Sequence, residues 1–418
     1  MEEEDNGKNG VIRLAKNTGF LYLLSLSSQI VNLALIPFET RVLGSEAYGV
    51  IALAVAMSSV VTVLLDFGFI LSATERTVKL VGDTRGLARL LGNVACAKAY
   101  LALAVGFVVS ALVIFVQPFS DHRALFLLYY LAYAVSAFLP DFFYRGHEDM
   151  RIITVRTMAV KVVSALPIFF LLRSPADMWV VPALLLVGNA AAVSFSYYDI
   201  RKRYRVRSLV CKRAESLGLL RMSFGFFVSR FASVFYQSMN SVLLGFAYPG
   251  QAIVGYYGAA EKFLSYSKAV SSPVADSLYP YMVRTRNYSL CIKILVVAMP
   301  LVLVAAVMGW VFAEPICLFA FGKGYEGSAE LLRCLMPAIV VILPTYVLCF
   351  PMLVPMGLSR YANRSNVIGA IVQVSLVGVL FGTGSFDARA LCLAASASEV
   401  SVFLYRLWAV WSHRGLIR

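Results

Sequence analysis

The middle of the chain reads Arg201-Lys202-Arg203-Tyr204-Arg205-Val206-Arg207, and Lys212 and Arg213 follow within a few residues. In a soluble protein, clustered Lys and Arg would suggest contact with the phosphates of a nucleic acid. Here apolar stretches long enough to cross a bilayer flank the basic run on both sides. The run is therefore typical of a cytoplasmic loop between two membrane halves.

The composition of the chain points the same way. Hydrophobic residues make up 60% of it and charged residues 14%, and the mean hydropathy is +0.77. Ordinary soluble domains have roughly 45–50% apolar and about 25% charged residues. The composition indicates a polytopic membrane protein with membrane lipids as its surroundings and no nucleic-acid partner. The net charge of +14 lies mainly in loops, where it orients the chain in the membrane.

Metal and redox chemistry have no visible signature in the sequence. The seven cysteines show no C-x-x-C pattern, and the three histidines show no ligand spacing. There is no P-loop and no H-E-x-x-H, so machinery for ATP or metal-dependent hydrolysis is not apparent. We expect no disulfide framework, no metal site and no cofactor.

Twelve apolar spans follow one another along the chain, six before the basic loop and six after it. They cover residues 17–37, 47–71, 92–116, 123–144, 152–172, 177–198, 219–246, 252–275, 291–314, 328–353, 365–383 and 388–411. Strands cannot leave an open edge in hydrocarbon, and a barrel would show short alternating segments instead. We therefore predict an all-α membrane protein with two six-helix lobes, residues 1–198 and 219–418, joined by a basic linker, residues 199–218.

The distribution of Lys and Arg predicts the orientation. If the amino terminus is cytoplasmic, the outer loops hold only five of these residues, Arg41, Arg123, Arg173, Lys323 and Arg389. Most of the others fall in the inner segments, so both termini should be cytoplasmic.

The two halves also resemble each other in detail. Ser25, Gln29 and Asn32 in the first span match Ser233, Gln237 and Asn240 in the seventh, all at an offset of 208 residues. A repeat of six helices has the same topology in both halves, which implies a pseudo-twofold axis along the membrane normal and a substrate path between the lobes.

Each of these lead spans carries its polar side chains on one helical face. Hydrogen bonding between helices is the simpler explanation for Ser, Asn and Gln in a membrane bundle. Arg230 favours a second explanation, because a charge about eleven residues inside a span requires water or a counter-charge. Arg230, Ser25, Gln29, Asn32, Gln237 and Asn240 are accordingly candidates for substrate binding in a wet cavity.

Further charged residues lie within spans. Lys161, Lys262 and Lys268 are additional candidates for binding an anionic substrate, and ion pairing, for example between Glu261 and Lys268, is the structural alternative. Glu261, Glu399 and Asp66 are candidates for carrying a coupling ion. For Asp66, which lies near the inner end of its span, capping or contact with the interface is an alternative.

Several stretches in order along the chain resemble the Wzx-type oligosaccharide flippases of bacterial O-antigen and capsule synthesis, within the multidrug/oligosaccharidyl-lipid/polysaccharide exporter superfamily. They are Pro37 to Gly49, Asp66 to Phe69 with Ser72-Ala73-Thr74, Phe142 to Met150, Val254 to Lys262, and Phe321 to Tyr325. Tyr144-Arg145-Gly146 stands where the family usually has Phe-Gln-Gly, and Thr74-Glu75-Arg76 where it has Thr-Arg-Glu. These departures put the roles of those side chains in doubt.

The resemblance implies a bacterial inner-membrane protein that is not an enzyme. Such flippases move an undecaprenyl-pyrophosphate-linked oligosaccharide from the cytoplasmic to the periplasmic leaflet, by alternating access coupled to an ion gradient. The polysaccharide polymerase machinery is a further candidate partner. A cationic cavity lined by Arg230 and the candidate lysines would suit a pyrophosphate head group.

Two other functions remain open from the sequence. A drug or cation exporter of the same superfamily would have the same spans. A membrane glycan polymerase would act on the same class of substrate, but such enzymes typically carry a large outer loop, and the longest outer segment here, residues 315–327, is short.

Overall fold

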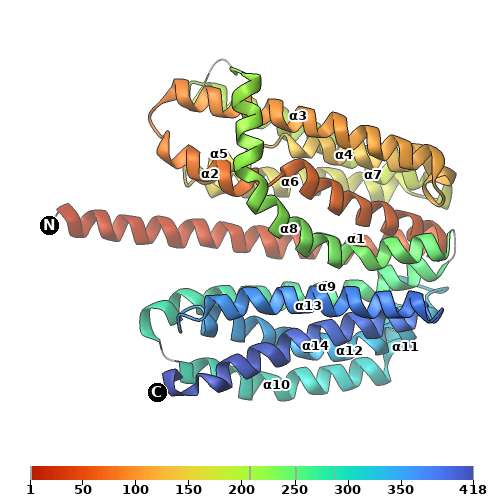
Figure 1. Cartoon of the computed structure of the whole chain (residues 1–418). Helices are drawn as coiled ribbons and strands as arrows, with labels where there is room; N and C mark the ends of the chain where they lie inside the picture. The colour runs from red at the N-terminus through yellow and green to blue at the C-terminus, as the bar shows by residue number, and fades with distance from the viewer. Residues whose placement is uncertain (1, 207–208, 250–251, 287, 418) are drawn as a thin grey trace. The chain divides into compact units, whose positions relative to one another are not determined.

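The computed structural model describes the backbone of residues 2–206, 209–249, 252–286 and 288–417. Side chains are described over the same ranges except for residues 2–30, 32–33, 229, 232–233, 235–238, 276–277, 280–281, 283–285 and 416–417. Within the described part the chain is almost entirely helical and contains no strand (Figure 1). The predicted all-α fold is confirmed.

The helices occur in the order that the hydropathy pattern predicts. The long ones are α1 (Glu2–Asp66), α3 (Thr84–Phe115), α4 (Arg123–Ala137), α6 (Met150–Leu171), α7 (Val180–Arg203), α8 (Arg213–Ala247), α9 (Ala252–Thr285), α10 (Tyr288–Val311), α12 (Glu326–Val347), α13 (Ser359–Gly382) and α14 (Ala388–Ser412). The short ones are α2 (Phe69–Lys79), α5 (Asp141–Gly146), α11 (Ala313–Phe321), the π-helical turn η3 (Leu348–Leu353) and the 3₁₀ turns η1 (Phe119–His122), η2 (Pro175–Trp179) and η4 (Arg414–Ile417).

Each predicted span coincides with one helix or with two consecutive ones, and α1 contains the first span and most of the second. Nine helical segments in the described part are long and apolar enough to cross a membrane, so the chain is a multi-pass membrane protein. The break inside α1 lies at Gly44, with φ 74° and ψ 174°. This conformation strongly favours glycine, since a Cβ would be strained there.

The fourth span of each half is less regular than predicted. In the first half α4 ends at Ala137, and α5 begins after Pro140, so residues 123–144 are two helices rather than one. In the second half α12 passes into the π-helical turn η3, which contains Pro351. Proline removes a backbone donor and clashes with the preceding turn, which accounts for both irregularities.

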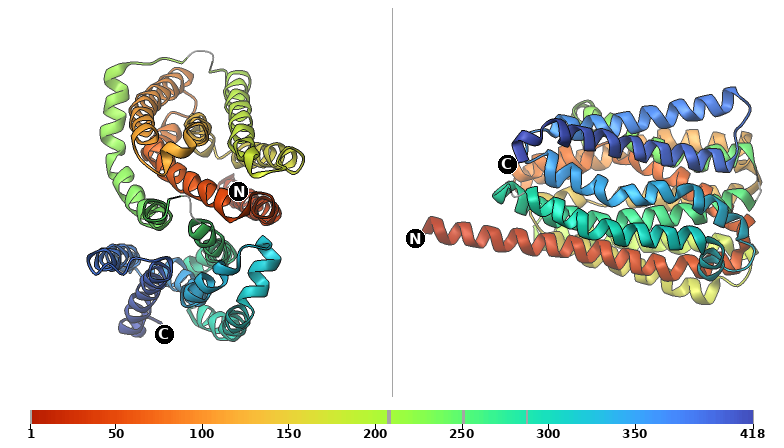
Figure 2. Two further views of the ribbon diagram at one scale, coloured as in Figure 1. Left: turned by 90° about the vertical axis from the view of Figure 1, so that its right-hand side faces the viewer. Right: turned by 90° about the horizontal axis from the view of Figure 1, so that it is seen from below.

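The chain forms two compact units. Unit 1 comprises Met1–Leu43 and Leu53–Ser238, and unit 2 comprises Gly44–Ala52 and Met239–Arg418. The predicted lobe boundaries at residues 198 and 219 stay a prediction. In Figure 2 (left) many helices of each unit are seen end-on and appear as rings.

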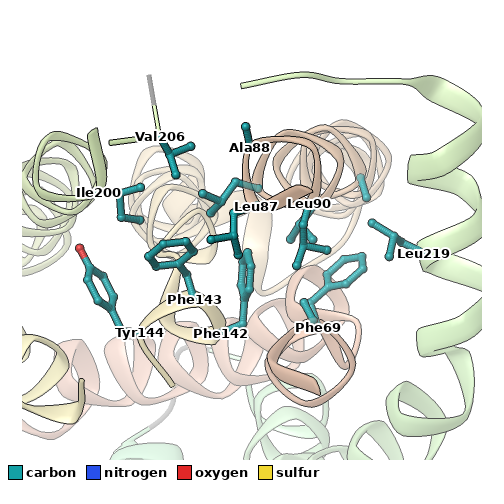
Figure 3. Packing of buried hydrophobic residues seen from close by; sticks show 14 of the residues in the cluster. Phe69, Leu87, Ala88, Leu90, Phe142, Phe143, Tyr144, Ile200, Val206 and Leu219 are labelled. Atoms are coloured by element: carbon teal, nitrogen blue, oxygen red, sulfur yellow. The ribbon is translucent and has the colours of Figure 1, made fainter. Parts of the chain in front are cut away.

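In unit 1, α4 packs against α3 and α7, α6 packs against α7, and α2 packs against α5. Aromatic and aliphatic side chains from α2, α3, α5 and α7 converge at one end of these helices. Figure 3 shows Phe69, Leu87, Phe142 and Phe143 pointing toward one another in this buried cluster. The stretch Phe142 to Met150, which carries part of the family resemblance, thus supplies core residues.

In unit 2, α12 packs against α9, α10, α11 and α14, and α13 packs against α14. The segment Gly44–Ala52 belongs to this unit and lies against the start of α9. The approach is close: a Cβ on Gly255 would lie 2.0 Å from the carbonyl oxygen of Ser45. Only glycine fits at such a contact, which gives a structural reason for the first glycine of the Val254 to Lys262 stretch.

The basic linker is attached to α3 rather than extended into solvent. Cys211 forms a disulfide with Cys96, with 6.3 Å between their Cα atoms. The expectation of no disulfide was therefore wrong for this pair. The amide of Lys212 donates to Asn93 Oδ1 at 2.7 Å, and Asn93 Nδ2 donates to Glu215 Oε2 at 2.6 Å. This hydrogen bond from Asn93 is the main reason that the pKa of Glu215 is lowered from its ordinary value.

Candidate functional site

The interior of unit 2 contains a chain of polar side chains from three helices. Asn240 on α8 accepts a hydrogen bond from Gln373 Nε2 on α13 at 2.8 Å. Gln373 Oε1 in turn accepts from the Ser398 hydroxyl on α14, also at 2.8 Å. All three are buried. Asn240 thus makes the helix-to-helix contact that was the alternative explanation for its polar stripe, and its contact with substrate stays a prediction.

Two of the predicted ion-coupling residues lie in the same unit. Glu399 forms an ion pair with Lys268, with 2.7 Å between Oε1 and Nζ, and both side chains are largely buried. Glu261 is half-buried, and its Oε2 accepts from the Ser241 hydroxyl at 3.5 Å. The structural alternative, ion pairing within the spans, holds for Lys268, but its partner is Glu399, 131 residues away in sequence, rather than Glu261. Half-buried Lys262 makes no hydrogen bond or ion pair with any other described side chain.

The candidate cations of unit 1 lie on two different helices. Arg230 on α8 is exposed, and it makes no ion pair with another described residue. Lys161 on α6 is half-buried, likewise without an ion pair among the described side chains. Because neither cation is neutralised by a described carboxylate, Arg230 and Lys161 could each bind an anion. The side chains of Ser25, Gln29, Asn32, Ser233 and Gln237 lie outside the described residues.

Asp66, the third predicted ion-coupling residue, ends α1 in unit 1. Its Oδ2 atom is buried and has no hydrogen-bond partner in the described part of the chain. Lys98 on α3 interacts electrostatically with Asp66 and Asp141, and its Nζ donates to the carbonyl oxygen of Ala137 at 2.6 Å. Burying a carboxylate oxygen without a hydrogen-bond partner is costly. Binding of a proton or a metal cation to this oxygen would reduce that cost.

The sequence did not identify Arg156 as a candidate, yet it is among the most buried charges of unit 1. Its side chain is 3% exposed and lies on α6, where NH2 pairs with Asp141 Oδ1 at 2.5 Å and NH1 donates to the Ser196 hydroxyl at 3.0 Å. Tyr144 donates to Asp199 Oδ2 at 3.1 Å beside it. The pair joins the break between α4 and α5 to α6 and α7.

Arg406 on α14 was missed in the same way. Its Nε donates to the Ser365 hydroxyl, NH1 to the Thr345 carbonyl oxygen and NH2 to Asn366 Oδ1, each at 2.8 Å. The side chain is buried. A periodic sequence signal could have found neither arginine, because each lies near the cytoplasmic end predicted for its span, where basic residues are common.

The described part of the chain contains no group of three His, Cys, Asp or Glu side chains that could hold a metal ion. Its polar interior consists of fixed charges and hydrogen bonds between helices, together with separate available cations. Such an arrangement can bind an anionic group and can hold helices in a defined packing. It offers no paired nucleophile and base among the residues described above.

Comparison with known proteins identifies the family. The family profile described as "Polysaccharide biosynthesis protein" matches residues 14–286. The chain belongs to this family.

Two curated relatives of this chain share one name with each other. The chain is 25% identical over 408 residues to a "Putative O-antigen transporter" of Shigella dysenteriae, covering 95% of this chain and 100% of the relative. It is 18% identical over 338 residues to a protein of the same name from Escherichia coli K12, covering 78% and 80%.

Solved structures share the fold. "Lipid II flippase MurJ" in an inward closed conformation aligns with a TM-score of 0.74 and 14% identity over 93% of this chain and 87% of that one. An inward-facing multidrug resistance transporter of the MATE family aligns with a TM-score of 0.68 and 13% identity over 94% and 98%. At these identities the similarity establishes the fold alone, and it agrees with the predicted two-lobe helical architecture.

Proposed function

We propose that this protein is a flippase that moves an undecaprenyl-pyrophosphate-linked oligosaccharide, an O-antigen or capsule repeat unit, across the bacterial inner membrane. The observation that carries the proposal is the similarity to a named O-antigen transporter along 95% of this chain and the whole of the relative. The fold shared with a lipid flippase supports it. The chain is then a transporter that binds its substrate and releases it chemically unchanged, by alternating access.

The charges of the described residues suit such a substrate. A pyrophosphate head group is a concentrated anion, and guanidinium binds phosphate oxygens in a bidentate geometry that an ammonium lacks. Arg230 is exposed and carries no ion pair with another described side chain. We assign it the primary contact with the head group, with Lys161 and Lys262 as supporting cations. The paired Lys268 is a weaker candidate because Glu399 already neutralises it.

Coupling to an ion gradient is the second part of the proposal. Asp66 is the first choice for the coupling carboxylate, because its buried Oδ2 has no partner among the described atoms. Glu261 is the second. Neither proton nor sodium is favoured by the geometry, so the test compares both gradients.

The test of the head-group assignment is restoration of surface polysaccharide in a strain that lacks its own flippase. Arg230→Lys should keep partial activity, Arg230→Gln should lose most of it, and Arg230→Glu nearly all, because a reversed charge repels the phosphates. Arg414→Gln, at an exposed position near the carboxyl end, is the matched control and should restore polysaccharide fully. Protein level in the membrane is checked for each variant.

Different results would contradict different parts of the proposal. Full restoration by Arg230→Gln would show that this arginine does not bind the head group. Failure of the wild-type chain to restore polysaccharide, with normal insertion and with lipid-linked oligosaccharide present on the cytoplasmic side, would reject the flippase function itself. For coupling, transport in everted vesicles should stop in Asp66→Asn when the relevant gradient is imposed, while head-group binding persists.

A further inference from the structure

A groove with a volume of about 610 Å³ lies on unit 1 between α6 and α7. None of the candidate substrate-binding or ion-coupling residues lines it. One end is charged, with lining residues Asp149, Arg151, Arg156, Asp199 and Arg203. The groove therefore differs in place and chemistry from the proposed transport site.

The acidic residues at the charged end already have partners. Asp149 Oδ2 accepts from Arg203 NH1 at 2.6 Å and from the Tyr204 hydroxyl at 3.2 Å. Asp199 Oδ2 accepts from a tyrosine hydroxyl, as described above. Exposed Arg151, in contrast, makes no hydrogen bond or ion pair with another described residue. The charge that remains available at this end is positive.

Buried Arg156 adds a second donor at the same end. It lines the groove, and its Nε atom is buried with no hydrogen-bond partner in the described part of the chain. An unsatisfied buried donor is costly, and an acceptor placed in the groove would remove that cost. Arg151 and Arg156 together thus favour an anionic group with oxygen acceptors.

Beyond the charged end the lining is apolar, and several of its side chains are small. Ala159 and Val163 contribute from α6, and Gly188, Ala191 and Phe195 from α7. The small Ala191 side chain on α7 leaves the space open, while Val163 and Phe195 are more than half exposed and form its rim. Such a slot accepts a hydrocarbon chain and offers no partner for a sugar.

The length of the groove matches one leaflet of a bilayer. Arg151 and Val163 lie twelve positions apart on α6, which at 1.5 Å per residue is roughly 18 Å. The hydrocarbon core of a bilayer is about 30 Å thick, so one leaflet is about 15 Å deep. The last turn of α7, next to the charged end of the groove, contains Arg201, Lys202 and Arg203, which are typical of the membrane interface.

We propose that this groove binds one anionic phospholipid of the surrounding bilayer. Its phosphate lies against Arg151 within reach of Arg156, and one acyl chain runs between α6 and α7 along Ala159 and Ala191. The proposal does not depend on the identity of the transported substrate. Burial of the acyl chain and the contact with arginine both contribute to the binding free energy. The combination distinguishes this lipid from the annular lipids that touch the helices elsewhere.

The experiment uses the full-length protein in vesicles that contain phosphatidylglycerol with a photoactivatable group midway along one acyl chain. After irradiation, the labelled peptides are identified by mass spectrometry. Labelling should concentrate on α6 and α7 peptides that contain Val163 and Phe195. A photoactivatable phosphatidylethanolamine at the same concentration should label these peptides several-fold less.

Two pairs of variants test the parts of the groove. Ala191→Trp fills the slot from an exposed position and should reduce this labelling at least tenfold, whereas Ala190→Trp, also exposed on α7 but outside the lining, should not. Arg151→Gln should reduce labelling several-fold, whereas Arg201→Gln, exposed and outside the lining, should not. Each variant must elute as a single species and melt like the wild type.

Three results would overturn the proposal. Labelling spread evenly over the spans would mean that the lipid is merely annular. Equal labelling of Ala191→Trp and Ala190→Trp would place the acyl chain elsewhere. Preferential labelling of the groove by a photoactivatable polyprenyl phosphate, with phosphatidylglycerol excluded, would assign the groove to the substrate's tail instead.

Discussion

Unit 1 and unit 2 each use one buried arginine to join their fifth and sixth spans to the end of the fourth, but the arginine comes from opposite helices. In unit 1, Arg156 lies on α6, the fifth span, and donates to Ser196 on α7. In unit 2, Arg406 lies on α14, the sixth span, and donates to Ser365 on α13. The arginine and the serine have exchanged places.

The partners at the fourth span also differ. Asp141, at the break between α4 and α5, gives Arg156 a carboxylate. Arg406 donates to the Thr345 carbonyl oxygen near the end of α12 and to the Asn366 amide oxygen, both neutral. Both units thus contain a contact between three helices that is centred on an arginine, with different residues at the fourth span. The two units should respond differently when that contact is removed.

The largest effect should come from Arg156→Met. It leaves the Asp141 carboxylate without its guanidinium, and breaking a buried ion pair on one side costs about 3–5 kcal/mol. Because Asp141 is 27% exposed, the lower end of that range is expected. The free energy of unfolding is measured by denaturation in mixed micelles. The double variant Arg156→Met with Asp141→Leu should recover most of the loss, and no recovery would show that the pair is not the cause.

Arg406→Met should have a smaller effect on unit 2. The three neutral oxygens lose a donor, and an unsatisfied buried group costs about 1–3 kcal/mol. All five free cysteines lie in unit 2, so a thiol-reactive dye reports the melting of this unit. A loss as large as that of Arg156→Met would mean that a negative group balances Arg406, and the contrast between the units would fail.

A second matched pair should show equal effects. Asn189 on α7 donates to the Ala132 carbonyl oxygen on α4 at 3.0 Å, and Ser396 on α14 donates to the Cys334 carbonyl oxygen on α12 at 2.7 Å. Each bond runs from the sixth span to the fourth. Asn189→Ala and Ser396→Ala should each cost about 0.5–1.5 kcal/mol, the usual net value of one hydrogen bond. Denaturation of both variants in the same micelles checks this, and a difference of several-fold would argue against equivalence.

The smallest predicted effect is a change in the pH dependence of the contact between the linker and α3, both of which are in unit 1. The pKa of Glu215 is lowered from its ordinary value of 4.5, chiefly by the hydrogen bond from Asn93. A carboxylate with a lowered folded-state pKa stabilises above its unfolded pKa, and this contribution is lost as the pH falls through the folded pKa. The attachment should therefore be intact at neutral pH and weaken below pH 4.5.

Hydrogen exchange of residues 209–216, corrected for the intrinsic exchange rate, measures this weakening. Protection should fall on acidification in the wild type. In Glu215→Gln it should be independent of pH over the same range. An identical fall in both would show that another group titrates.

The sequence predicted the helical architecture and the positions of the spans because burial in a bilayer requires long apolar segments. It could not predict that Lys268 pairs with Glu399, since 131 residues separate them and only the packing of α9 against the rest of unit 2 brings such groups together. The Cys96–Cys211 bond was missed for the same reason, as no local spacing marks it. Arg156 and Arg406 were hidden among basic residues whose position topology alone explains.

The residues proposed for transport also differ in how well the sequence indicated their surroundings. Arg230 was selected for a charge inside a span, and it is exposed and available. Asn240 was selected for its place in a repeated stripe, and it is buried in a hydrogen-bond chain with Gln373. Position in an internal repeat therefore predicts helix packing at least as well as it predicts contact with a ligand, and contact of Arg230 with the substrate stays a prediction.

The disulfide between Cys96 and Cys211 closes the backbone into a covalent ring that contains the second half of α3, all of α4 to α7 and the start of the linker. A protease that cuts the basic segment between Tyr204 and Val210 would open this ring without separating the chain into two pieces. The nicked protein would migrate as a full-length molecule on a gel without reductant and as two fragments with it. The disulfide thus keeps the fragment that contains α1 to α7 covalently joined to the fragment that begins with α8, even when the peptide chain between them is broken.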